Sequence, residues 1–403
     1  MHVLWAVAAA SLLAWIGLLL ARGGYWRVSP RLVPPPVDDP LPHPGVVAVI
    51  PARNEADVLP ETLPTVLAQR YPGPFRVVLL DDRSEDGTAT AAQDAAAAIL
   101  ATDRLQIVPG APLPSGWSGK VWAMHQGALV AGCTAPAARP VALHQAERPE
   151  FLWLTDADVA HEPWVLQALV DRAETDRLDL VSAMARLRVG SGWDRLLVPA
   201  FVYFFAKLYP FRFVGDPRRH DAGAAGGCVL VRRGALERAG GFEAIRSALI
   251  DDCALARRIK RAGGRLWLGF SRGVSSVRRY GRLASVWAMV TRSAYTQLGH
   301  SPLMVIGTVI GMLFLYALPP AACLGGAVAT ALAVPGALAL AAVGGAGWGL
   351  MTASFVPIVR HHGVGPWWAG SLPAAGVLYT AMVISSAWCH ARGRGGAWKG
   401  RTY

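Results

Sequence analysis

Cysteine and lysine are both scarce in this sequence. The five cysteines lie far apart, at positions 133, 228, 253, 323 and 389, and no Cys-x-x-Cys pair occurs. Dispersed cysteines in odd number argue against a disulfide framework and against a structural zinc site. The formal net charge is +12, carried mainly by arginine. Because no basic base-reading helix and no RNA-binding motif accompany this charge, we expect no nucleic-acid partner. A domain that faces anionic lipid explains the arginines more simply.

Formal charge is missing altogether from three long stretches, residues 2–21, 293–359 and 370–390. Twenty helical residues rise roughly 30 Å, which is enough to cross the core of a bilayer. Nearly all the charge lies between these stretches. We therefore predict one soluble domain that lies between membrane segments in the sequence. The predicted parts are an N-terminal anchor (1–22), a Pro-rich linker (23–45), the soluble domain (46–292), a C-terminal membrane region of about three helices (301–391) and a basic tail (392–403).

The arginines around the apolar segments predict the orientation of the chain. Arg22, Arg27 and Arg31 follow the first segment, so the positive-inside rule places the N-terminus outside and the soluble domain in the cytoplasm. A cleaved signal peptide is the alternative, but no basic residue precedes the apolar run and no clear cleavage site follows it. The basic tail also favours the cytoplasm, which requires an odd number of spans. The simplest count is four, and this conflict stays open.

Five apolar runs in the middle region have the length of buried strands: 46–50, 75–82, 105–110, 150–158 and 178–184. Stretches with helical spacing separate them. Strands that are apolar on both faces and alternate with helices predict an α/β fold with a mostly parallel sheet, covered by helices on both sides. In such sheets, ligands bind beyond the carboxyl ends of the strands.

Polar residues follow three of these strands. They are Arg53-Asn54-Glu55, Asp81-Asp82 and Asp156-Ala157-Asp158. A single aspartate at a strand end is explained by a turn. Three such ends at one sheet edge indicate a site, and carboxylates that act together with substrate phosphates suit Mg²⁺ or Mn²⁺.

Two further motifs could supply chemistry at this edge. Lys120 follows a loop rich in glycine and serine, where a lysine can meet a diphosphate, although Gly-Lys pairs are common. Asp251 and Asp252 stand at the start of a predicted helix that stops at Gly263-Gly264. They could be a helix cap, or a general base that takes a proton from an acceptor hydroxyl. The glycines at 226–227 could line an acceptor cleft or form a tight turn.

The order of these motifs resembles family 2 glycosyltransferases of the GT-A fold over about residues 45–270. The matching motifs are "PARNE", "DDRSEDGT", Gly-Lys, "DAD" and "DD" at a helix start. More narrowly, "GWSGKVWAMHQG", "AAGGCVLVRR" and "TRSAYTQLGHSPL" resemble the hopene-associated glycosyltransferases of hopanoid gene clusters.

The resemblance implies a UDP-sugar donor, a lipid acceptor, a divalent metal and a multi-pass enzyme of the bacterial inner membrane. It also implies roles for single residues. Pro51, Arg53, Glu55, Asp81 and Asp82 would form the nucleotide pocket, with Asp81 on the uracil; Lys120 would meet the diphosphate, Asp156 the ribose or metal, Asp158 the metal, and Asp252 would be the base. Asp251 stands where the family usually has Glu.

Polymer-forming relatives carry Gln-x-x-Arg-Trp after the base helix, and here only Arg292 matches. We therefore expect transfer of a single sugar, and we place Arg292 over the diphosphate as a hypothesis. The apolar stretch 196–213 predicts an interfacial helix, with a core helix as the alternative. Polyprenyl phosphate and glycerolipid or ceramide-type lipids are rival acceptors. A nucleotidyltransferase and a non-catalytic scaffold are rivals of other classes.

Overall fold

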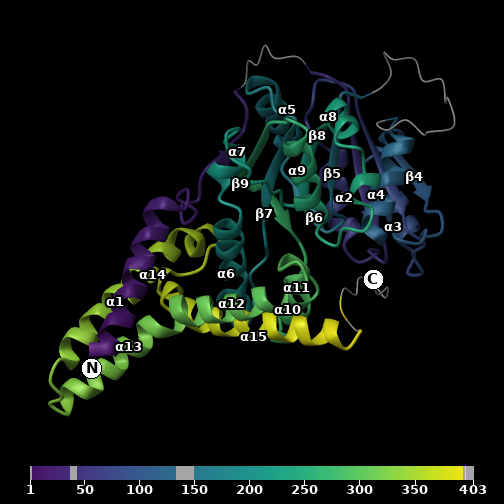
Figure 1. Ribbon diagram of the computed structural model, residues 1–403. Coiled ribbons are helices and arrows are strands. Elements are labelled where there is room, and N and C mark those ends of the chain that lie inside the picture. Colours follow the sequence, from purple (N-terminus) through teal and green to yellow (C-terminus); the bar gives the residue numbers. More distant parts are fainter. Residues whose placement is uncertain (1, 37–42, 133–148, 394, 396–403) are drawn as a thin grey trace.

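The structure is a computed structural model that describes residues 2–36, 43–132, 149–393 and 395. A sheet domain and a group of long helices make up the chain (Figure 1). Cys133 and most of the predicted basic tail, including Lys399 and Arg401, lie outside the described residues.

The sheet domain is built on a nine-stranded mixed sheet in the order β1-β9-β7-β8-β5-β2-β3-β4, with β6 paired to β9. The strands are β1 (Arg31–Leu32), β2 (Val46–Ala52), β3 (Phe75–Asp81), β4 (Leu105–Pro109), β5 (Phe151–Thr155), β6 (Val159–His161), β7 (Leu180–Arg186), β8 (Cys228–Arg232) and β9 (Leu266–Ser276). All five predicted strands are present. Most pairs are parallel, as predicted, but β8 runs antiparallel to both β5 and β7.

Helices cover both faces of the sheet. They are α2 (Leu59–Leu67), α3 (Thr88–Ala98), α4 (Gly119–Val130), α5 (Val165–Thr175), α7 (Phe211–Gly215), α8 (Arg233–Arg238) and α9 (Asp251–Arg261). Along β2, Val47 and Val49 point into one hydrophobic core while Val46, Ala48 and Ile50 point into the other. This alternation is the period of two expected of a strand buried on both faces, so the continuous apolar runs of the sequence are explained by two cores.

Helix α6 (Gly192–Leu208) joins the sheet domain to the long helices. A capping box starts it, in which the Asp194 backbone N–H donates to Ser191 and the Ser191 N–H donates back to Asp194. The helix packs against α10 (Leu283–Thr291), α14 (Ala337–His361) and α15 (Leu372–Ala391). Many of its side chains are buried, while Trp193 and Leu208 are exposed. This burial is closer to the core-helix alternative than to an open interfacial helix.

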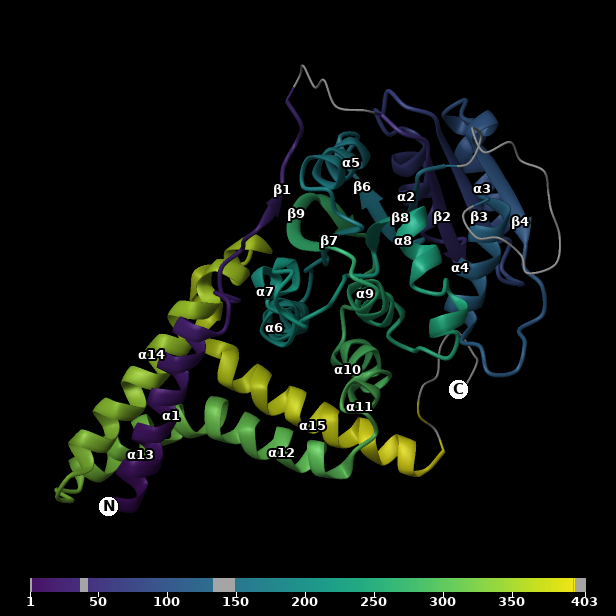
Figure 2. The ribbon, with the colours of Figure 1, turned by 45° about the horizontal axis from the view of Figure 1, so that its top comes forward.

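The remaining long helices form two groups, which meet at an angle in both views (Figures 1 and 2). One group is α1 (His2–Ala21), α13 (Leu318–Ala331) and α14 (Ala337–His361), packed together and directed away from the sheet. The other is α12 (Pro302–Met312) and α15 (Leu372–Ala391), which run side by side beneath α10 and α11 (Ala294–Gln297). Pro335 lies between α13 and α14, whereas residues 318–320 continue the helical path.

A π-helical turn, η4 (Leu313–Ala317), connects α12 to α13. Such a turn leaves carbonyl groups without their usual helical partners. Side chains of α1 satisfy two of them, because Ser11 Oγ donates to the Phe314 carbonyl at 2.7 Å and Trp15 Nε1 to the Leu315 carbonyl at 2.8 Å. The N-terminal helix is therefore fixed to the C-terminal region by specific hydrogen bonds as well as by apolar contact.

Five helical segments of the described chain are long and apolar enough to cross a membrane, judged by length and composition. They are His2–Ala21, Gly192–Gly215, Pro302–Ala331, Ala337–His361 and Pro366–Ala391.

Candidate active site

Hydrogen bonds connect the loops after β2 and β3 at the carboxyl edge of the sheet. The Arg53 guanidinium donates to the Asp82 carbonyl at 2.7 Å, and the Glu55 backbone N–H donates to Thr88 Oγ1 at 3.0 Å. The two loops continue paired strands, since Ala52 lies opposite Asp81 in the sheet. The predicted convergence of these two strand ends is confirmed in position.

The two aspartates after β3 occupy different environments. Asp81 is half-buried, and its Oδ1 accepts the Ser84 backbone N–H at 3.0 Å, which shapes the turn. Asp82 is fully buried. Pro51 is buried in β2, opposite Leu80. Asp81 is thus the member of the pair whose side chain lies nearer to solvent at the sheet edge.

The Asp-Ala-Asp turn between β5 and β6 is held from behind. Thr155 Oγ1 lies 2.8 Å from His161 Nε2 across the turn, and Thr62 Oγ1 of α2 donates to the Ala157 carbonyl at 2.6 Å. These buried hydrogen bonds fix the backbone, so Asp156 and Asp158 project from a defined position. Their side chains are 32% and 14% exposed.

Lys120, near the start of α4, connects this turn to α9. Its Nζ lies 2.7 Å from Asp156 Oδ1 and 3.3 Å from Asp251 Oδ2. Burial alone lowers the pKa of Lys120, but the charges of Asp156 and Asp251 outweigh burial and hold its pKa above the ordinary value. The lysine is therefore charged, and one cation links two motifs that are far apart in the sequence.

Asp252 lies in the first turn of α9, as predicted, and its carboxylate is bound on both oxygens. The Gly226 backbone N–H donates to Oδ2 at 2.8 Å, and the Cys253 N–H donates to Oδ1 at 2.7 Å. Burial and then the charge of Asp251 raise the pKa of Asp252 to about 6, although Lys120 acts in the opposite direction. A carboxyl group with such a pKa is mostly ionised at neutral pH and still basic enough to accept a proton.

The sequence reasoning missed Arg278, which follows β9. Its Nε lies 2.6 Å from Asp158 Oδ2, and its terminal nitrogen lies 3.4 Å from both carboxylate oxygens of Glu55. No spacing rule connects residues 120 positions apart, so only the pairing of β6 with β9 could reveal this contact. Arg292 is exposed just after α10. Burial and the charges of Asp158 and Asp156 raise the pKa of Tyr280, and the charge of Arg292 acts in the opposite direction.

A divalent cation is compatible with the Asp-Ala-Asp turn only if a ligand brings further oxygens. Among the described residues, no cluster of three or more acidic, histidine or cysteine side chains could hold a metal ion. Asp156 pairs with Lys120 through Oδ1 and Asp158 pairs with Arg278 through Oδ2, and each carboxylate has a second oxygen that could bind a metal ion. Two carboxylates completed by substrate phosphates are a common Mg²⁺ environment. The residues therefore fit a metal that arrives with a phosphate-bearing ligand.

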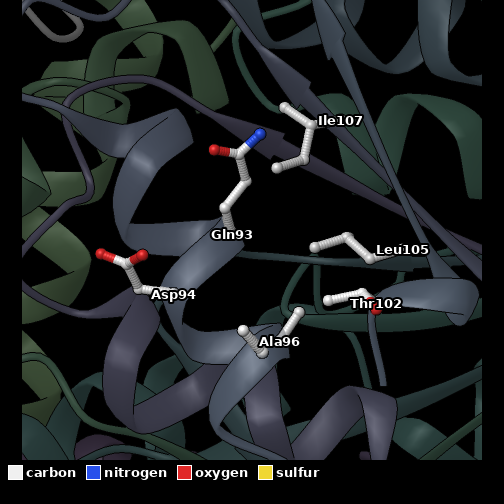
Figure 3. Close-up of a pocket in the computed structure, with 7 residues that line it drawn as sticks. Gln93, Asp94, Ala96, Thr102, Leu105 and Ile107 are labelled. Carbon is white, nitrogen blue, oxygen red and sulfur yellow. The ribbon is translucent and has the colours of Figure 1, made fainter. Parts of the chain in front are cut away.

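Two surface hollows lie away from this acidic site. The hollow in Figure 3 has a volume of about 460 Å³, lies between α3 and β4, and is lined partly by Gln93, Asp94 and Ile107. The other, about 290 Å³, lies at the β1 edge and is lined partly by Arg31 and His361. None of the predicted site residues lines either hollow.

Comparison with known proteins defines the class of this chain. Residues 43–294 match the family described as "Glycosyltransferase like family 2". No curated protein sequence matches. Among solved structures, the mannosyltransferase PcManGT from Pyrobaculum calidifontis, in complex with GDP-Man and Mn²⁺, has 21% identity and a TM-score of 0.54, covering 96% of this chain and 99% of that one. Glucosyl-3-phosphoglycerate synthase of M. tuberculosis has 17% identity and a TM-score of 0.39, covering 64% and 80%.

The matched segment contains the whole acidic site and spans more than half of the chain. The protein is therefore a glycosyltransferase with a GT-A-like α/β fold. It belongs to glycosyltransferase family 2.

Gly226 provides a test of this geometry, because its backbone approaches Asp252 closely. A Cβ at this position would lie 3.2 Å from Asp252 Oδ2 and 3.4 Å from Lys120 Nζ. We predict that Gly226→Ala displaces the carboxylate and lowers turnover on the order of 10-fold, while the unfolding temperature changes little. Gly192→Ala is the matched control, since a Cβ there meets nothing within 4 Å. Wild-type turnover in Gly226→Ala would show that the carboxylate position is not critical.

Proposed function

We propose that this glycosyltransferase is bound to the membrane and transfers a single sugar from a UDP-sugar to a lipid acceptor, with inversion at the anomeric carbon. The observation that carries the proposal is the position of Asp252. Its ionisable carboxylate belongs to the residue after Asp251, and Lys120 pairs with both Asp251 and Asp156 of the Asp-Ala-Asp turn. One lysine thus contacts both the helix start that carries the proposed base and the turn proposed to bind phosphate.

The loops after β2 and β3 form the part of the site that we propose binds the sugar donor. We assign the nucleotide to Pro51, Arg53, Glu55, Asp81 and Asp82, with Asp81 as the group that accepts the N3–H of uracil. The neighbour in complex with GDP-Man and Mn²⁺ supports a nucleotide sugar as donor. Uracil as the base depends on the Asp81 assignment.

The proposed reaction is a single displacement. Asp252 accepts the proton of the acceptor hydroxyl, whose oxygen forms a bond to the anomeric carbon as the bond to the diphosphate breaks and UDP leaves. Attack on the face opposite the diphosphate inverts the configuration. Asp251 keeps Lys120 in place, and the lysine charge is available to the diphosphate. Asp156 and Asp158 would hold Mg²⁺ or Mn²⁺, which when bound supplies positive charge to the leaving group.

The long helices support three membrane crossings and two helices along the membrane surface. The free ends of α1, α13 and α14 lie far from the sheet domain (Figures 1 and 2). Large apolar side chains on these helices are exposed, among them Leu13, Leu324 and Leu338. Helices α12 and α15 also expose apolar side chains, such as Ile310 and Trp388, but lie beneath the sheet domain. Three crossings by α1, α13 and α14 give an odd number.

An odd number of membrane crossings agrees with the distribution of arginines along the chain. The N-terminus then lies outside the cytoplasm, while Arg22, Arg360 and Arg392 all stand at helix ends on the side of the sheet domain. This arrangement follows the positive-inside rule. The conflict left by counting four apolar spans disappears if α12 and α15 do not cross. We therefore place the catalytic domain at the cytoplasmic face of the inner membrane.

A lipid acceptor fits the position of α10 and α11. These helices lie between the base helix α9 and the α12/α15 pair in both views (Figures 1 and 2). They are tied to α15, because Trp287 Nε1 donates to Ser385 Oγ and the Tyr295 N–H donates to Ser386 Oγ. A lipid could then present its polar head without leaving the bilayer. The family resemblance favours a hopanoid, with polyprenyl phosphate and glycerolipid or ceramide-type lipids as rivals.

The proposal is tested by UDP release from the detergent-purified protein, with a panel of UDP-sugars, Mn²⁺ or Mg²⁺, and each lipid class in turn. We expect release to depend on one lipid class and to fall at least about 100-fold in Asp252→Asn, because the base is removed. Asp103→Asn, an exposed site in the turn before β4, should release UDP as the wild type does.

Other outcomes contradict parts of the proposal. If UDP release depends on a lipid other than a hopanoid, the hopanoid is rejected as the acceptor, while the proposal of sugar transfer to a lipid is retained. Release of pyrophosphate in place of UDP indicates a nucleotidyltransferase. No release with any donor, from folded protein that also fails to bind UDP-sugars, argues against a UDP-sugar as the donor.

The membrane arrangement has its own test in a variant without native cysteines. We predict that Val334→Cys, in the turn between α13 and α14, reacts with a membrane-impermeant maleimide in intact spheroplasts, because this turn is at the far end of the helices. Arg360→Cys, at the opposite end of α14, should react only after permeabilisation. Labelling of both residues from the same side would exclude α14 as a crossing helix.

A further inference from the structure

The loop after β9 brings a guanidinium group onto the second carboxylate of the Asp-Ala-Asp turn. Val159 of β6 pairs with Ser276 of β9, and the Val277 backbone N–H donates to the Asp158 carbonyl at 2.9 Å. The next residue is Arg278, whose Nε lies 2.6 Å from Asp158 Oδ2. The contact is thus a direct result of strand pairing.

The position of this loop is fixed from two sides. The Arg278 backbone N–H donates to Ser276 Oγ at 3.3 Å, and the Gly281 N–H donates to Asp194 Oδ1 at 3.0 Å. Asp194 is buried and is the N3 residue of the capping box of α6. The loop is therefore anchored to the helix that joins the sheet domain to the long helices.

Arg278 also has a second anionic neighbour. Its terminal nitrogen lies 3.4 Å from each carboxylate oxygen of Glu55, which comes from the loop after β2. The side chains of Glu55 and Asp158 are 11% and 14% exposed, and that of Arg278 is 40% exposed. Arg278 can consequently leave Asp158 toward solvent while it keeps an anion beside it.

A divalent ion and Arg278 compete for the same carboxylate. Both are cations, and their mutual repulsion near Asp158 opposes binding of the metal alone. A nucleoside diphosphate adds negative charge at this edge, and its oxygens can bind the metal and the guanidinium together. The diphosphate should therefore favour metal binding more than it would in a site without Arg278.

We propose that Arg278 is a positioning residue that acts as the built-in counter-ion of Asp158 and makes tight metal binding depend on the nucleoside diphosphate. The inference rests on the proposed metal-dependent use of a nucleotide sugar. Glu55 holds Arg278 after its displacement, so both loops of the donor side take part in the exchange.

The test is direct binding of Mn²⁺ to the full-length protein in detergent, followed by the electron paramagnetic resonance signal of free Mn²⁺, with no nucleotide and then with UDP or GDP. For the wild type we expect weak binding of Mn²⁺ alone and affinity at least about 5-fold higher with the nucleotide. Arg278→Gln should bind Mn²⁺ alone more tightly than the wild type, and the nucleotide should raise its affinity by a smaller factor than in the wild type.

Two matched variants separate this role from a structural one. Arg278→Lys keeps the positive charge and should restore much of the dependence on nucleotide. Arg279→Gln, at the exposed neighbouring position, should behave as the wild type. Unfolding temperatures in the same detergent identify any variant that is not folded, in which case Arg278→Lys and Arg278→Ala are compared.

The proposal is overturned if folded Arg278→Gln binds Mn²⁺ alone no more tightly than the wild type. Nucleotide-enhanced Mn²⁺ binding of the same size in both proteins would overturn it as well, while leaving the proposed function intact. If the wild type binds no Mn²⁺ with either nucleotide, the metal-dependent function fails, and this inference fails with it.

Discussion

The ion pairs of Lys120 are the interaction on which the rest of the site depends. The lysine lies at the start of α4, yet it binds Asp156 from the turn between β5 and β6 and Asp251 from the start of α9. Without a cation at this point, three carboxylates would face one another in a partly buried space, and their repulsion would be costly. The lysine therefore allows the proposed phosphate-binding edge and the proposed general base to occupy the same site.

A second cation balances the other half of the site. Arg278 pairs with Asp158 and Glu55, as Lys120 pairs with Asp156 and Asp251. Each cation joins carboxylates from two different loops. The acidic residues are thus held in place by charge before any ligand binds, and a ligand that carries phosphate can exchange with these pairs instead of entering an unscreened acidic pocket.

Much of the fold could be predicted from the sequence because the strands are buried on both faces. Continuous apolar runs mark β2, β3, β4, β5 and β7, and the polar and acidic residues stand at the ends of β2, β3 and β5. The start of α9 at Asp251 was also predictable from its polar first turn and terminal glycines. Such signals are local, so they are visible in a single sequence.

Other features were not predictable because they arise from contacts between distant segments. The antiparallel position of β8 between β5 and β7 brings Gly226 to Asp252, and the pairing of β6 with β9 brings Arg278 to Asp158. Neither contact has a sequence spacing of its own. The proposed number of crossing helices was likewise hidden in the sequence, because α12 and α15 are apolar whether they cross a membrane or lie along it.

The most direct test of the account is the pH dependence of kcat/KM for Lys120→Met beside the wild type. The wild-type enzyme should gain activity as pH rises through about 6, because Asp252 must be ionised to act as the base. Since the charge of Lys120 lowers the pKa of Asp252, its removal should shift this rise to higher pH. The unfolding temperature shows whether the variant is folded. An unchanged profile in folded Lys120→Met would contradict the claim that this lysine couples the two halves of the site.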